Sequence, residues 1–188
     1  MDLTSSVRTD ALPAVASIMV PGALASLPYL ALVWGHPHNL KAFVEAREGV
    51  STAVGVLLLV GSGFLIESVG SYVEYYVIDR FHGDRTAMLQ RWRDYLRLAW
   101  TTEPVGQHYL RRILIVFKFE LNLLVATTAG IPAVFALACY GVLTPLRFGL
   151  ILCLQIGLAL YLTVAAIASS KLLDELRGYL LRQREAQP

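Results

Sequence analysis

The sequence predicts an all-α integral membrane protein, a four-helix bundle with two further amphipathic helices at the membrane interface or in the cytosol. Hydrophobic residues make up 56% of the 188 positions and charged residues only 16%. Soluble domains are about 45–50% apolar and about 25% charged. The excess apolar surface must therefore face lipid or apolar protein. Four apolar stretches are long enough to cross a bilayer, which takes about 20 residues.

The first two predicted spans cover residues 11–34 and 49–74. The first is free of charge, and its apolar run continues past a possible cleavage site at Ala23–Ala25 to Trp34, which favours a retained helix over a cleaved signal peptide. Pro21 and Pro28 remove backbone hydrogen bonds within it, so we expect a kinked span, with a re-entrant segment as the alternative. The second run continues through glutamates, which predicts a tilted helix or one that extends beyond the membrane surface.

The third and fourth predicted spans cover residues 113–143 and 148–170. The connection between them is so short that the two helices must form an antiparallel hairpin. Cys139 and Cys153 then lie near the outer ends of these spans. We expect two buried free thiols, with a disulfide as the alternative in an oxidising compartment.

Two further segments show the helical apolar period, one within residues 79–112 and one over residues 171–185. Both are predicted to be amphipathic surface helices. In the first segment, arginines alternate with aromatic residues, which favours contact with anionic lipid or with a cytosolic protein. The contact residues that we expect there are Arg91, Trp92, Arg93, Arg97 and Trp100. No nucleic-acid partner is expected, because the net charge is only +2.

The basic residues predict the orientation in the membrane. Most of them lie within residues 79–112 and after residue 170, whereas the opposite side would hold only Lys41, Arg47 and Arg147. Basic residues near spans favour the cytoplasmic side. With four spans, the long loop and both termini are therefore predicted to be cytoplasmic, in a cell (inner) membrane.

A stripe of carboxylates marks one face of the second span. Gly63, Glu67, Gly70, Ser71 and Glu74 recur there at helical spacing. Ionisable groups inside a bilayer are expensive and face protein or water. The third span enters the membrane at a comparable depth with its own pair of charged residues. The predicted polar or ion site consists of Glu67, Ser71, Glu74, Lys118 and Glu120, with a structural ion pair as the alternative.

A divalent metal site is a weaker hypothesis from the same region. Oxygen and imidazole ligands suit several divalent metals. The sequence has no His-Glu-x-x-His motif and no Glu-x-x-His pair, and it does not identify a cofactor. The candidate ligands are Glu67, Glu74, His82, His108 and Glu120.

The leading functional hypothesis is a non-enzymatic membrane component that homo-oligomerises or binds a cytosolic protein partner. Four short spans leave little room for an enclosed cavity within one subunit. Two alternatives use the glutamates: a membrane-embedded enzyme, with or without a metal, and an oligomeric ion or proton channel. A small-molecule or ion ligand fits any of the three.

Overall fold

The computed structural model describes residues 3–35, 47–76, 85–96 and 105–185, and every regular element in these ranges is a helix. The elements are α1 (Leu3–Gly35), α3 (Glu48–Tyr76), α4 (Arg85–Leu96), α5 (Val105–Cys139) and α6 (Pro145–Glu185). The four longest helices each contain a stretch long and apolar enough to cross a membrane. The predicted all-helical architecture with four long apolar helices is confirmed.

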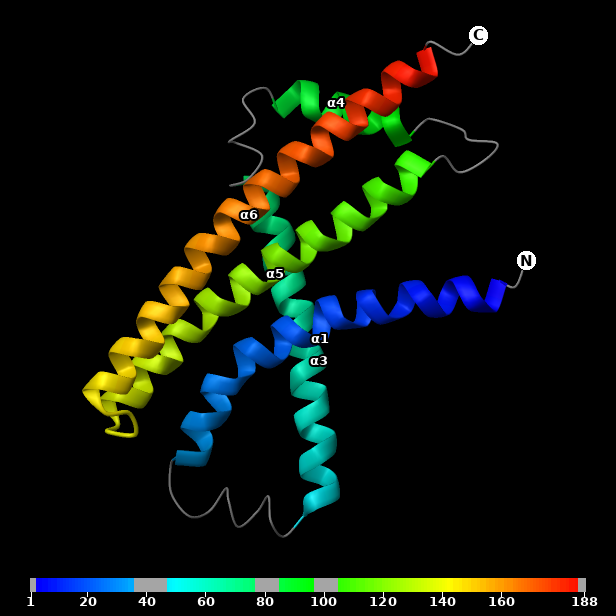
Figure 1. Cartoon of the computed structure of the whole chain (residues 1–188). Coiled ribbons are helices and arrows are strands. Elements are labelled where there is room, and N and C mark those ends of the chain that lie inside the picture. Colours follow the sequence, from blue (N-terminus) through cyan, green and yellow to red (C-terminus); the bar gives the residue numbers. More distant parts are fainter. Residues whose placement is uncertain (1–2, 36–46, 77–84, 97–104, 186–188) are drawn as a thin grey trace.

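Helix α5 is the centre of the arrangement (Figure 1). It contacts α1, α3 and α6, whereas α6 packs only on α5 and α4 within the described part of the chain. Half of the apolar span of α5 is buried (50%), compared with 11% for the spans of α3 and α6. The outer faces of α3 and α6 are therefore left for lipid or for another protein chain.

The antiparallel hairpin of α5 and α6 is present as predicted (Figure 1). Gly141 ends α5 with a φ of 71°, and the amide of Val142 donates to the carbonyl of Leu137 at 3.0 Å. This left-handed glycine cap satisfies the last carbonyls of a helix. Thr144 then accepts from the Arg147 amide at 3.4 Å, and Pro145 takes the first helical position of α6.

Helices α1 and α3 cross at glycines. A side chain at Gly22 would overlap the carbonyl oxygen of Leu59, and one at Gly63 would overlap that of Ile18. Beside this crossing, the hydroxyls of Ser26 and Ser62 lie 2.9 Å apart. Small residues that allow close backbone approach are typical of helix pairs in lipid.

Helix α1 bends along its length, and its amino-terminal part projects to one side of the other helices (Figure 1). Kinks of this kind are usual at proline. Pro21 and Pro28 both lie inside α1, so the bend agrees with the predicted kink.

The carboxyl-terminal segment differs from the prediction. Residues 171–185 do not form a separate surface helix but continue the fourth span as the last part of α6, a single helix of 41 residues. No proline or glycine interrupts the chain near residue 170, and leucine, lysine and arginine are good helix formers. At about 1.5 Å per residue, α6 is roughly 60 Å long, about twice the thickness of the hydrocarbon core.

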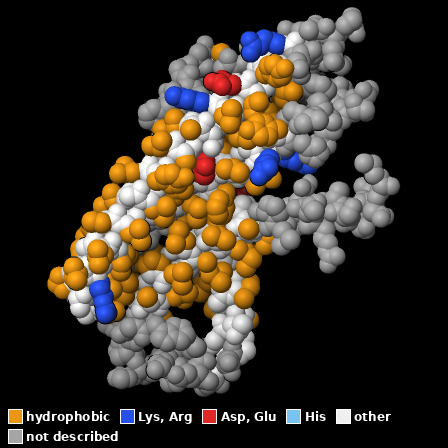
Figure 2. Space-filling view, in the orientation of Figure 1, with side chains coloured by type: hydrophobic (Ala, Val, Ile, Leu, Met, Phe, Trp, Pro, Cys, Tyr) orange, Lys and Arg blue, Asp and Glu red, His pale blue; other side chains and the backbone are white. Residues whose placement is uncertain are grey.

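The charged residues gather at one end of the molecule. Helix α4, the start of α5 and the end of α6 lie together at the upper end of Figure 1, and the turn between α5 and α6 lies at the lower end. Figure 2 shows an apolar surface over the middle and most of the charged side chains near the upper end. A core cluster of Tyr95, Leu110, Phe117, Leu173 and Leu180 joins α4 to the paired helices there.

Candidate polar site at the ends of α3 and α5

The predicted polar residues lie about one bilayer thickness from the lower end of the molecule. Ser71 and Glu74 come roughly 33–38 Å of helix after Gly49, and Lys118 lies roughly 32 Å of helix before Cys139. Since the hydrocarbon core is about 30 Å thick, a membrane-spanning placement puts these groups at the opposite lipid–water boundary.

Lys118 joins α5 to α3. Its ammonium forms an ion pair with Glu74 and lies 3.4 Å from the hydroxyl oxygen of Ser71. The two charged side chains are 33% and 29% exposed, so the pair is partly withdrawn from solvent. Three of the five predicted site residues, Ser71, Glu74 and Lys118, are therefore brought together, and their contact fits both the predicted polar site and the alternative of a structural ion pair.

Glu120 belongs to a different helix contact. Its carboxylate accepts a hydrogen bond of 2.8 Å from the hydroxyl of Ser169 on α6. Residues two apart on a helix point in different directions, so Lys118 and Glu120 serve opposite neighbours of α5. Of the five predicted site residues, Ser71, Glu74 and Lys118 thus meet between α3 and α5, whereas Glu120 belongs to the contact between α5 and α6.

Glu67 lies on the predicted stripe of α3 without joining the ion pair. Gly63 of this stripe faces α1, and Gly70 faces the buried amide of Asn122 on α5. Glu67 itself is half-buried, and no hydrogen bond or ion pair joins it to another described residue. The stripe is therefore the packing face of α3.

A groove of about 350 Å³ opens beside the ion pair. Residues from four helices line it: Ser71, Glu74, Tyr75, Leu89, Trp92, Leu114, Lys118 and Arg177. The Arg177 guanidinium lies 4.2 Å from the centre of the Trp92 ring, and this ring stacks on Tyr95 with centroids 5.9 Å apart. The cation–π contact fixes α4 against the carboxyl-terminal part of α6, residues 171–185, which is called here the far half of α6.

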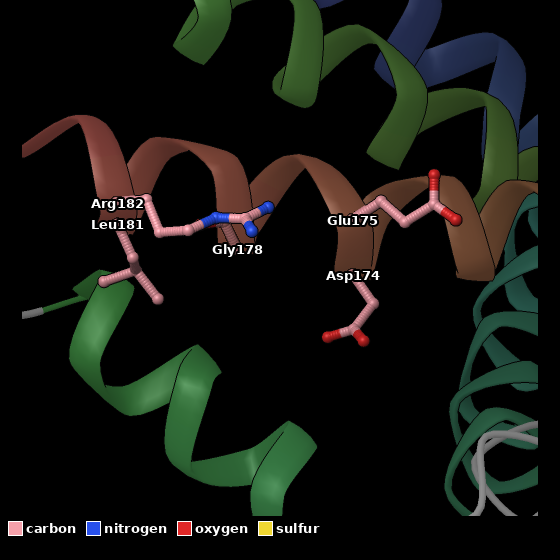
Figure 3. A pocket seen from close by; sticks show the side chains of 5 residues that line it. All are labelled: Asp174, Glu175, Gly178, Leu181 and Arg182. Carbon is pink, nitrogen blue, oxygen red and sulfur yellow. The ribbon is translucent and has the colours of Figure 1, made fainter.

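A second groove of about 420 Å³ runs along the far half of α6 (Figure 3). Asp174, Glu175, Gly178, Leu181 and Arg182 line it, and Leu181 points toward α4. Both acidic side chains and the arginine come from α6, so this surface has mixed charge. It has no converging set of groups that would indicate chemistry.

The predicted surface contacts are described only in part. Trp92 faces α6 and not open solvent, while Arg93 is exposed as expected. Arg97, Trp100 and the side chain of Arg91 lie outside the described residues. Arg177 was not a predicted site residue, because the sequence does not reveal that α4 folds back onto α6.

The metal hypothesis gains no support from the described residues. Among them, no group of three histidine, cysteine, aspartate or glutamate side chains could hold an ion. His82 and the side chain of His108 lie outside the described residues.

The two cysteines, Cys139 and Cys153, are free, as expected, but exposed. The prediction that they are buried is wrong, because Cys153 lies on the exposed face of α6 and Cys139 is the last residue of α5, beside the exposed turn.

Comparison with protein-family models, curated proteins and solved structures gives no match.

Proposed function

We propose that the chain is a non-enzymatic, multi-pass component of a cell (inner) membrane that assembles with further copies of itself. One observation supports this best: the charged groups near the membrane boundary serve helix packing. Lys118 pairs with Glu74, and Glu120 accepts from Ser169. Ionic groups used in this way fix how helices meet, and among the described residues the predicted carboxylates Glu74 and Glu120 lie at separate helix contacts and do not converge as an acid–base pair.

The distribution of basic residues supports a cytoplasmic upper end. Arg93, Arg112, Lys171 and Arg182 are exposed in the part of the molecule that holds α4, the start of α5 and the end of α6. Basic residues near spans favour the cytoplasm. In this orientation, α4 and the far half of α6 form a platform at the cytoplasmic membrane surface, to which a cytosolic protein can bind.

The outer face of α6 is the proposed contact between copies. Gly149, Cys153 and Gly157 follow one another at intervals of four residues, and a side chain at either glycine would meet nothing within 4 Å. Leu154 and Val164 flank this stripe, each with about 70% of its surface exposed. A stripe of small residues lets a second helix approach closely enough for dense packing, which drives association in lipid.

Oxidative cross-linking in native membranes tests the assembly. The variant Cys139→Ser keeps only Cys153, and we expect it to form a disulfide-linked dimer, because paired α6 helices would bring the Cα atoms of Cys153 within about 7 Å. The matched variant Cys153→Ser keeps the exposed thiol of Cys139, which lies off the stripe, and should stay monomeric. A strictly monomeric particle in mild detergent, together with no Cys153 dimer, would refute the oligomer.

The enzyme and ion-channel hypotheses depend mainly on Glu67. It is the one predicted carboxylate without a polar partner among the described residues. The other two carboxylates are held at separate interfaces. Among the described residues, no further observation therefore supports the enzyme or the ion channel.

A further inference from the structure

The packing face of α3 carries an unpaired carboxylate close to a buried amide oxygen of α5. We propose that Glu67 and the Oδ1 atom of Asn122 together bind one monovalent cation, either a sodium ion or a proton carried on the carboxyl group. Both groups are acceptors, so they attract each other only through a cation or a proton between them. The inference requires that the four apolar helices cross a membrane, but it does not depend on the assembly of copies.

The amide oxygen of Asn122 is the first observation. Asn122 is 2% exposed, and its Oδ1 atom is buried with no hydrogen-bond partner in the described part of the chain. A buried acceptor without a donor is costly, and native proteins satisfy nearly all such groups with protein atoms, water or an ion. We therefore expect a donor or a cation at this oxygen.

The kink of α1 fixes the direction of this oxygen. Pro21 has no N–H group, so the carbonyl of Ser17 lacks its usual helical donor. The Nδ2 atom of Asn122 donates to this carbonyl at 3.3 Å. The reverse orientation of the amide would place two acceptor oxygens together, so Oδ1 must point away from α1. It points at Gly70 of α3, where the first atom of a side chain would lie only 2.6 Å from it.

Glu67 lies one helical turn from this contact, on the same face of α3. It comes between Gly63 and Gly70, the two positions at which α3 closely approaches α1 and α5. Residues three apart on a helix have Cβ atoms about 5–6 Å apart, a gap that a glutamate side chain is long enough to cover. No hydrogen bond or ion pair with a described residue holds the Glu67 carboxylate in another direction.

The charges around Glu67 favour a positively charged ligand. On α5, Lys118 is engaged by Glu74, and Glu120 is engaged by α6. Helix α1 has no charged residue over positions 11–35, and α6 does not contact α3 within the described part of the chain. A carboxylate without a neutralising partner is expensive inside a bilayer, and a single bound positive charge would compensate it.

The two groups lie at the same depth in the membrane. Glu67 comes about 27 Å of helix after Gly49, and Asn122 about 26 Å of helix before Cys139. Since the hydrocarbon core is about 30 Å thick, both groups lie just inside the lipid–water boundary, where a cation can enter from water. One carboxylate and one neutral amide oxygen match the charge of a monovalent ion, whereas a divalent ion usually takes more acidic ligands.

Thermal unfolding of the full-length protein in non-ionic detergent tests the proposal. Sodium chloride is compared with choline chloride at equal ionic strength, because screening is then the same in both series, and the pH is varied in each. A sodium ligand should raise the melting temperature by about 3–6 °C over choline when sodium reaches about ten times its dissociation constant. A proton ligand should raise it as the pH falls, equally in both salts. Protein that responds to neither cation would overturn the proposal.

The variant Glu67→Gln assigns the response to this site. Its amide has no charge and can donate directly to Oδ1 of Asn122. We expect the variant to lose the response to the cation and to unfold near the melting temperature of the occupied parent protein. The matched control, Glu120→Gln, removes a carboxylate that Ser169 already engages, and it should keep the response. A response that persists in Glu67→Gln, or is lost equally in Glu120→Gln, would refute the site.

A second pair of variants tests the amide oxygen itself. In Gly70→Ala, the new methyl group would lie 2.6 Å from Oδ1 of Asn122, so the oxygen must turn away, and the response to the cation should be lost. In the control Gly61→Ala, the methyl group meets nothing within 4 Å, and the response should remain. A full response in Gly70→Ala would show that Asn122 is not a ligand and would overturn the proposal even if Glu67→Gln failed to fold.

Discussion

At the scale of residues, Lys118 and Glu74 neutralise each other's charge at the proposed lipid–water boundary. Lys118 and Glu74 are about two-thirds buried, so neither is fully hydrated, and each depends on the other. Removing one partner of a buried pair is more costly than removing both, because an isolated charge then stays desolvated. The ion pair therefore has its main effect on which helices meet and at what height.

A double-mutant cycle tests this dependence. Lys118→Met should lower the free energy of unfolding by about 1–3 kcal/mol, between the values for exposed and buried pairs. The double variant Lys118→Met/Glu74→Gln should recover most of that loss, because no unpaired carboxylate remains. Chemical unfolding in detergent, followed by circular dichroism, gives the three values. A single variant as stable as the parent protein would show that the pair contributes nothing.

Asn122 is a buried polar residue at the contact between two apolar helices. It is 2% exposed, and its amide donates to the carbonyl of Ser17 at 3.3 Å. This hydrogen bond joins α5 to α1. Thr127 and Thr128 instead bond to carbonyls of their own helix, as hydroxyls in membrane helices often do.

At the scale of elements, the crossing of α1 and α3 depends on the absence of side chains. Gly22→Ala should cost about 1–3 kcal/mol, the usual range for overpacking, because the new methyl overlaps the Leu59 carbonyl. The control Gly61→Ala, on the exposed face of α3, meets nothing and should be neutral or stabilising by up to about 1 kcal/mol. Thermal unfolding in detergent compares the two. Equal effects would contradict the close crossing.

The sequence predicts the spans much better than it predicts their partners. Hydropathy and length identify all four apolar helices, and the short turn near Gly141 predicts the hairpin. The central place of α5 is not predictable in this way, because lipid-facing and helix-facing residues in a membrane are both apolar. Gly63 lies on the stripe that the sequence marks on the second span, but Gly22 looks like other glycines in the sequence until the backbones are placed together.

The sequence named several residues of the candidate site, but it did not show which of them would lie in contact. Helical spacing places Ser71 and Glu74 on one face and separates Lys118 from Glu120 in direction. Spacing within a helix does not show which neighbouring helix packs against each of its faces. The hydrogen bond between Ser169 and Glu120 was therefore missed. Arg177 was missed for a related reason: residues 171–185 were expected to lie flat on the membrane, whereas α6 continues as one helix.

The whole molecule has two unlike ends. The lower end of Figure 1 holds the turn between α5 and α6, and the upper end holds α4 and the part of α6 that extends past one bilayer thickness. The core cluster of Tyr95, Leu173 and Leu180 continues from the spans into this upper part. The platform is therefore packed on the apolar helices, so a displacement of α4 would also affect α5 and α6.

Cysteine labelling in intact cells tests the placement of both ends. In a background of Cys139→Ser and Cys153→Ser, the variants Arg93→Cys and Arg182→Cys should react with an impermeant maleimide only after the cells are permeabilised. Cys139, kept alone in Cys153→Ser protein, is exposed near the hairpin turn and should react without permeabilisation. The reason is that basic residues near spans stay in the cytoplasm. Reaction of Arg93→Cys and Arg182→Cys from different sides would refute four spans, whereas reversal of all three results would refute only the orientation.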